Sequence, residues 1–124
     1  MKDEFEELLD AVKRCRRYCP VVKEDTTEKH AIEIKKEAEE VLKAIEKGDN
    51  KNLQEELGDV FWDLLMTIII AEQEGKVNSN KVIEEVIDKF KRRKPFIFKG
   101  KTTTKEKAWE MWNKEKDKEK KWIK

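Results

Sequence analysis

Apolar residues recur three and four positions apart through most of the chain, which is the periodicity of amphipathic helices, and strand-like alternation is rare. A helix is expected to end before Cys19-Pro20, and Gly48-Asp49-Asn50 is typical of one helix end followed by the next helix start. The pattern therefore predicts an all-α fold, a helical bundle of four core helices plus a C-terminal helix. The predicted helices cover residues 3–17, 28–47, 52–74 and 81–93, and the last begins after Thr102–Thr104.

The chain length of 124 residues fits one domain over residues 1–124, since domains commonly have about 100–150 residues. Within it, Pro95–Phe98 is predicted to be an apolar extended stretch that packs back on the bundle. Residues 99–124 are predicted to form a lysine-rich, helical C-terminal tail.

Composition excludes several kinds of chemistry. The 29 basic and 28 acidic residues leave a formal net charge of +1, so we expect neither a nucleic-acid nor a membrane partner. The four glycines lie too far apart for a glycine-rich phosphate loop. His30, Cys15 and Cys19 give one ligand fewer than a closed zinc site needs. An enzyme of this composition would use carboxylates, lysines, arginines and a hard metal ion.

Two further features indicate the compartment. Cys15 and Cys19 lie four apart in a helical stretch, where free thiols are more common than a disulfide bond, and this favours the cytoplasm. The longest apolar run, Leu64–Ala71, is much too short to cross a membrane, and Met1–Glu4 lacks an apolar signal region.

Acidic residues at the edges of two apolar stripes are the main candidates for chemistry. Glu37 and Glu40 share one face of the second predicted helix, and Glu56 and Asp59 share the matching face of the third. If the helices pack antiparallel, the four carboxylates lie along one seam. Two charges about 4 Å apart repel by about 4 kcal/mol at an effective dielectric of about 20, so such a seam requires a cation, and Mg²⁺ or Mn²⁺ would suit it.

The spacing alone leaves a second interpretation open, because acids that flank an apolar stripe are commonly solvated. Glu4 and Glu7 have the same spacing in the first helix without other signs of a site. Gly58, between the two acids of the third helix, is interpreted as allowing close approach of a neighbour.

Basic and aromatic residues near the C-terminus are the second group of candidates. Lys89 and Arg93 are expected one helical turn apart at the edge of an apolar stripe. There they would either bind a polyphosphate or stabilise the C-terminal end of the helix by interacting with its dipole. Trp109 and Trp112 would stack on a base or anchor the last helix. His30 is interpreted as an ordinary residue at the start of the second helix.

Five short motifs follow one another along the chain. They are Cys19-Pro20 with Thr26, Glu37–Val41, the E-L-G-D sequence Glu56–Asp59, Arg92–Phe98 and Trp109-Glu110. Their order and separations resemble the MazG family of nucleotide pyrophosphohydrolases. In two places the chain departs from the family pattern: Lys36 replaces a glutamate, and Val21-Val22 replaces tryptophan-aspartate.

The resemblance implies a MazG-like all-α fold and Mg²⁺-dependent hydrolysis of a nucleoside triphosphate to the monophosphate and pyrophosphate. It implies that the catalytic, metal-binding residues are Glu37, Glu40, Glu56 and Asp59. It also implies that Lys89 and Arg93 hold phosphates and that Trp109 lies near the nucleotide.

The alternatives are a related pyrophosphohydrolase of narrower range, acting on dUTP, dCTP or phosphoribosyl-ATP, and a non-catalytic helical interaction module with a basic tail. Asp63 and Glu40 are both candidates for the group that deprotonates the attacking water. The third predicted helix is apolar nearly all round, which predicts a homodimer that shares its bundle between subunits.

Overall fold

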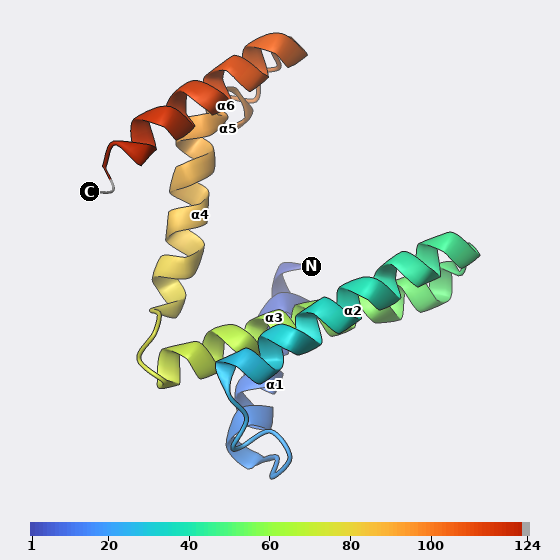
Figure 1. Cartoon of the computed structure of the whole chain (residues 1–124). Coiled ribbons are helices and arrows are strands. Elements are labelled where there is room, and N and C mark those ends of the chain that lie inside the picture. The colour runs from blue at the N-terminus through green and yellow to red at the C-terminus, as the bar shows by residue number, and fades with distance from the viewer. Residues whose placement is uncertain (123–124) are drawn as a thin grey trace. The chain divides into compact units, whose positions relative to one another are not determined.

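The computed structural model describes residues 1–122, which contain six helices and no strand, so the predicted all-α fold class is confirmed (Figure 1). The chain divides into two compact units, Met1–Ser79 and Asn80–Lys124. The single domain predicted from the length stays a prediction. The helices are α1 (Lys2–Tyr18), α2 (Thr27–Lys47), α3 (Asn50–Gln73), α4 (Ser79–Arg93), α5 (Pro95–Phe98) and α6 (Lys105–Lys120).

In the first unit, α2 and α3 pack side by side as a helical hairpin (Figure 1). The turn between them depends on Gly48, whose φ of 66° is left-handed and whose N–H donates to the carbonyl oxygen of Ile45 at 3.1 Å. The next residue, Asp49, starts α3 by accepting a hydrogen bond from the backbone N–H of Asn52 at 3.1 Å. The prediction that one helix ends and the next begins at residues 48–50 is confirmed.

The apolar core of this unit forms where α1 crosses α3. Val12, Met66 and Ile70 are completely buried, and Leu65 is buried beside them. Partly buried side chains of α1 and α3 surround these residues. Burial of such side chains stabilises the fold by about 1.5–3 kcal/mol each, so the core fixes α3 and thereby the acids that it carries.

The loop between α1 and α2 is held by Arg16. Its Nη1 donates to the carbonyl oxygens of Val22, at 2.7 Å, and Asp25, at 2.9 Å, and its Nε donates to Gln73 Oε1 at 2.8 Å. Thr26 then caps α2 by accepting a hydrogen bond from the backbone N–H of Lys29. The loop and the start of α2 are therefore fixed relative to the C-terminal end of α3.

In the second unit, α4 and α6 are joined through Glu119. Arg93 donates from Nε and Nη2 to its two carboxylate oxygens, at 3.2 and 3.0 Å, and lies 4.7 Å over the ring of Trp112. Arg92 lies 3.3 Å from the same carboxylate, and the two guanidinium groups lower the pKa of Glu119 to about 2. The prediction that Thr102–Thr104 caps the last helix is confirmed by the side chain of Thr104.

Two expectations are wrong. Pro95–Phe98 is a short helix rather than an extended stretch, because a proline at the first helical position presets a helical φ and lacks only an N–H that has no helical partner there. At Gly58, an added Cβ would meet no other atom of the described residues within 4 Å, so this glycine does not mediate close approach within the chain. No helix in residues 1–122 is both long and apolar enough to cross a bilayer.

Candidate metal centre

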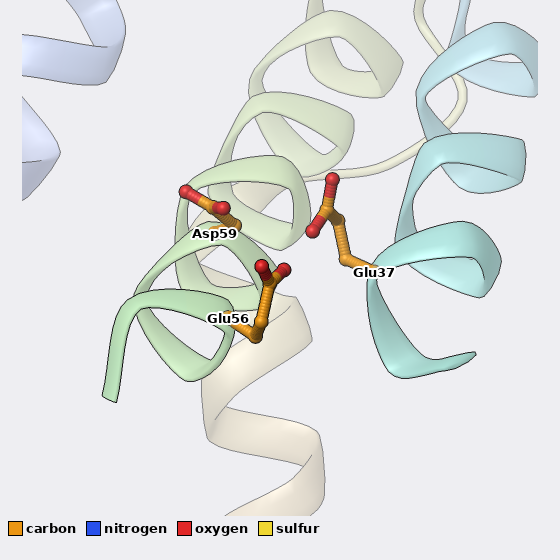
Figure 2. A group of neighbouring side chains, drawn as sticks. All are labelled: Glu37, Glu56 and Asp59. Carbon is orange, nitrogen blue, oxygen red and sulfur yellow. The ribbon is translucent and has the colours of Figure 1, made fainter. Parts of the chain in front are cut away.

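Three carboxylates converge where α2 and α3 pack together. Figure 2 shows the side chain of Glu37 on α2 pointing across to Glu56 and Asp59 on α3. Each contributes one oxygen, and these oxygens lie within 4.8 Å of one another. Glu37 and Glu56 are half-buried and Asp59 is exposed, so the group is open to solvent on one side. We call these three residues the acid cluster.

The hairpin turn explains why these residues meet. Glu37 lies 11 residues before Gly48, and Asp59 lies 11 residues after it. Because both helices rise by about 1.5 Å per residue, equal separations from the turn bring both residues to about the same level of the hairpin. Glu40 and Glu56 have the same relation, at eight residues on either side.

The acid cluster is electrostatically strained in the absence of a cation. The pKa of Glu37 is raised from 4.5 to about 7; burial is the largest cause, and a hydrogen bond with Glu56 and the charges of Asp59, Glu56 and Asp63 act in the same direction. A carboxyl with this pKa is protonated in about half of the molecules at neutral pH, and the proton reduces the repulsion within the cluster.

We expect the melting temperature of the metal-free protein to fall as the pH rises from about 5 to 8. The pKa of Glu37 is higher in the folded chain, about 7, than its ordinary value of 4.5, so the stability that it contributes is complete below pH 4.5 and is lost as the pH rises through 7. Thermal denaturation in a chelator at several pH values measures this. A melting temperature that rose over the same range would contradict the raised pKa.

The acid cluster has the ligand chemistry of a hard divalent cation. Its donors are carboxylate oxygens, which Mg²⁺ and Mn²⁺ prefer, and a cation would remove the repulsion that raises the pKa of Glu37. The residues present therefore fit such an ion.

Glu40, the fourth predicted ligand, lies outside this group of three. Its Oε1 lies 3.2 Å from Lys43 Nζ, one turn further along α2, and its side chain is 46% exposed. Its backbone lies at about the same level of the hairpin as that of Glu56, but its carboxylate is paired with Lys43.

Asp63 adjoins the cluster one turn further along α3. Burial is the main cause that raises its pKa, and Glu33 and Asp59 add to it, while the charge of His30 acts in the opposite direction. The Asp63 Oδ1 lies 3.9 Å from Nδ1 of His30, which in turn contacts Asp25 through Nε2 at 2.9 Å.

His30 differs from the expectation of an ordinary residue at the start of the second helix, because its two ring nitrogens face two carboxylates. Two signals were present: it is the only histidine of the chain, and Asp25 lies five positions before it, just outside the helix. The second partner, Asp63, comes from a distant part of the sequence, so the local pattern gives no indication of it.

The predicted substrate-binding residues all belong to the second unit. Lys89 is half-buried on α4, Arg93 is bound to Glu119, and Trp109 is 58% exposed on α6. Trp109 lines a pocket of about 520 Å³ together with Phe90, Lys94, Lys105, Ala108 and Trp112. The roles predicted for Lys89, Arg93 and Trp109 stay predictions.

Comparison with known proteins gives consistent matches. The chain is 32% identical over 99 residues, 77% of its length, to the nucleoside triphosphate pyrophosphohydrolase of Escherichia coli (strain K12), and spans 38% of that protein. It is 29% identical over 108 residues, 86% of its length, to the nucleoside triphosphate pyrophosphohydrolase/pyrophosphatase MazG of Thermotoga maritima, and spans 42% of it. It thus covers about two fifths of these relatives.

A solved structure and a family model agree with these matches. The crystal structure of a mazG-related protein from Thermotoga maritima superposes with a TM-score of 0.85 at 31% sequence identity, covering 90% of this chain and 98% of that one. The family model described as the MazG nucleotide pyrophosphohydrolase domain matches residues 25–98, a range that contains the whole acid cluster. The chain therefore belongs to the MazG nucleotide pyrophosphohydrolase domain family.

Proposed function

We propose that this protein hydrolyses a nucleoside triphosphate to the monophosphate and pyrophosphate and that it depends on Mg²⁺, with Mn²⁺ as an effective substitute. The observation that carries the proposal is the convergence of Glu37, Glu56 and Asp59 at the α2–α3 hairpin, within the segment that matches the family. The relatives from Escherichia coli and Thermotoga maritima, by name triphosphate pyrophosphohydrolases, support the same reaction.

The acid cluster would hold the cation, and Glu40 would join it as a fourth ligand after leaving Lys43. The cation, when bound, would supply polarisation of phosphate oxygens and a lower pKa for water. Asp63 would orient the attacking water and accept its proton, because its side chain is 15% exposed and its raised pKa favours proton uptake. Glu40 is the weaker candidate for this role, since its carboxylate is paired with a lysine.

Residues of the second unit would bind the substrate. Lys89 and Arg93 would neutralise phosphate charge, and Trp109 would contact the nucleotide base. Arg93 already binds one anion in a bidentate manner, the carboxylate of Glu119. A phosphate group would offer the same arrangement of oxygens to the guanidinium and would therefore compete with Glu119 for it.

The test is a panel of nucleoside triphosphates, including dUTP and dCTP, together with phosphoribosyl-ATP, assayed for pyrophosphate release with and without Mg²⁺. Release that requires Mg²⁺ supports the proposal, and turnover of one compound alone indicates the narrower substrate range. If the panel gave no pyrophosphate at millimolar Mg²⁺, the protein would be the non-catalytic interaction module instead.

We also propose that the protein is a homodimer, as the apolar character of α3 predicts. Large apolar side chains stay exposed on the hairpin, among them Leu42, Ile45, Phe61 and Leu64, each between 42% and 61% exposed. A monomeric protein rarely exposes apolar side chains in such number on neighbouring helices.

Light scattering at micromolar concentration should give twice the chain mass of 14.8 kDa. We expect Leu64→Lys to shift the equilibrium toward the monomer, because it places a charge in an apolar contact, while Gln54→Lys, on the same helix, should not change the mass. A wild-type monomer under these conditions would refute the dimer. Location in the cytoplasm stays a prediction from the sequence, as does the expectation of no membrane or nucleic-acid partner.

A further inference from the structure

A buried histidine connects the α1–α2 loop to the edge of the acid cluster. The side chain of His30 is only 8% exposed, and its two ring nitrogens face carboxylates of different segments. Nε2 lies 2.9 Å from Asp25 Oδ2, and Nδ1 lies 3.9 Å from Asp63 Oδ1. The orientation of the imidazole ring between two acids is defined, because each nitrogen faces a different carboxylate.

The Asp25 side of this arrangement is rigid. The backbone oxygen of Asp25 accepts a hydrogen bond from Arg16 at 2.9 Å, its Oδ1 accepts one from Lys29 at 2.8 Å, and its Oδ2 contacts His30. The hydrogen bond with Lys29 is the main reason that the pKa of Asp25 is lowered, so this carboxylate is ionised and accepts the N–H of His30 Nε2. The ring of His30 is therefore fixed from one side.

The Asp63 side is incomplete. Nδ1 of His30 is buried and makes no hydrogen bond with any described residue, and a buried polar atom without a partner is costly. The nearest acceptor is Asp63 Oδ1, which lies less than 1 Å beyond hydrogen-bond distance. A small rotation of the Asp63 carboxyl group would give the two groups one shared proton, which either of them can carry.

We propose that His30 is a positioning residue, which holds the carboxyl group of Asp63 in a fixed orientation beside Glu37 and Asp59. Asp63 lies one helical turn after Asp59 on the same face of α3, and it interacts electrostatically with Asp59 and Glu37, so its orientation determines which oxygen faces the acid cluster. His30 does not touch the substrate; it acts through Asp63, and Asp25 fixes the ring for this purpose. This inference rests on the proposed function, in which Asp63 orients the attacking water.

Two isosteric variants separate positioning from packing. In His30→Asn the amide nitrogen takes about the place of Nδ1 and keeps a donor for Asp63, whereas in His30→Gln it reaches about the place of Nε2 and keeps only the contact with Asp25. We expect His30→Gln to lower kcat by about 10- to 100-fold with little change in KM or in the affinity for Mn²⁺, and His30→Asn to retain more of the rate. Equal kcat values for the two variants would overturn the proposal.

A second measurement does not depend on activity. Because His30 is the only histidine, the ring nitrogens of a ¹⁵N-histidine-labelled, tag-free protein give one set of NMR signals. The Nδ1 resonance should move on titration with Mg²⁺ and should differ between the wild type and Asp63→Asn. Signals unchanged in both comparisons would refute the link between His30 and Asp63. If Asp63→Asn failed to fold, the Mg²⁺ titration of the wild type would decide alone, and an unmoved Nδ1 signal there would refute the link.

The outcomes also distinguish this inference from the function on which it rests. A wild type that releases pyrophosphate and binds Mn²⁺, together with a fully active His30→Gln, would refute the positioning role alone. A wild type that neither binds Mn²⁺ nor releases pyrophosphate would refute both.

Discussion

The Glu56→Gln variant should lose pyrophosphate release by about a thousandfold while it stays folded. Glu56 shares a hydrogen bond with Glu37 and lies within the acid cluster, so its replacement by a neutral amide removes one of the charges that would hold the cation. A thousandfold change corresponds to about 4 kcal/mol of transition-state stabilisation, which is within the contribution of a metal ion to such a reaction. Initial rates at saturating Mg²⁺ measure the loss.

The matched control is Glu55→Gln, an exposed acid on the same turn of α3 that is not part of the acid cluster. It makes the same chemical change at the adjacent position and should leave the rate unchanged. If Glu56→Gln retained more than a tenth of the wild-type rate, the acid cluster would have no essential role and the catalytic group would lie elsewhere.

The Glu37→Gln variant should be more stable than the wild type without metal and should lose the response to metal. Burial and the neighbouring acids disfavour the ionised form of Glu37, so a neutral side chain of the same shape removes a cost on the order of 1–2 kcal/mol at pH 8, after allowance for solvent screening. This corresponds to a rise of a few degrees in melting temperature. Millimolar Mg²⁺ should stabilise the wild type and have little effect on the variant.

Thermal denaturation at pH 8, in chelator and in Mg²⁺, tests both parts of this prediction. Glu39→Gln, an exposed position on α2, is the control and should behave as the wild type in both conditions. A lower metal-free melting temperature for Glu37→Gln would mean that the ionised carboxylate stabilises the hairpin, contrary to the raised pKa.

Local features of the sequence were sufficient to predict the frame of the site. Gly48 and Asp49 mark the turn, and helical periodicity places Glu37, Glu56 and Asp59 at the edges of the two apolar stripes that pack together. The turn residues and the helical periodicity both depend on neighbours within one or two helical turns, so both can be recognised in a single amino-acid sequence.

Other features depend on residues that are distant in the sequence, and these were missed. The partners of His30 are Asp25 and Asp63, and Arg93 is bound to Glu119, 26 positions away. A helical pattern shows which face of a helix a residue occupies but not which side chain of another segment reaches it. Glu40 is an example: its face of α2 was predicted from the sequence, but its ion pair with the lysine on the following turn was not.

The position of the acid cluster within one hairpin has a consequence for folding. All three acids lie within residues 37–59, so the contacts that assemble them have low contact order and close only a short loop. The hairpin can therefore form early, before the second unit has emerged during synthesis. Mutually repelling carboxylates would slow that early step, and divalent cations in the medium should accelerate it.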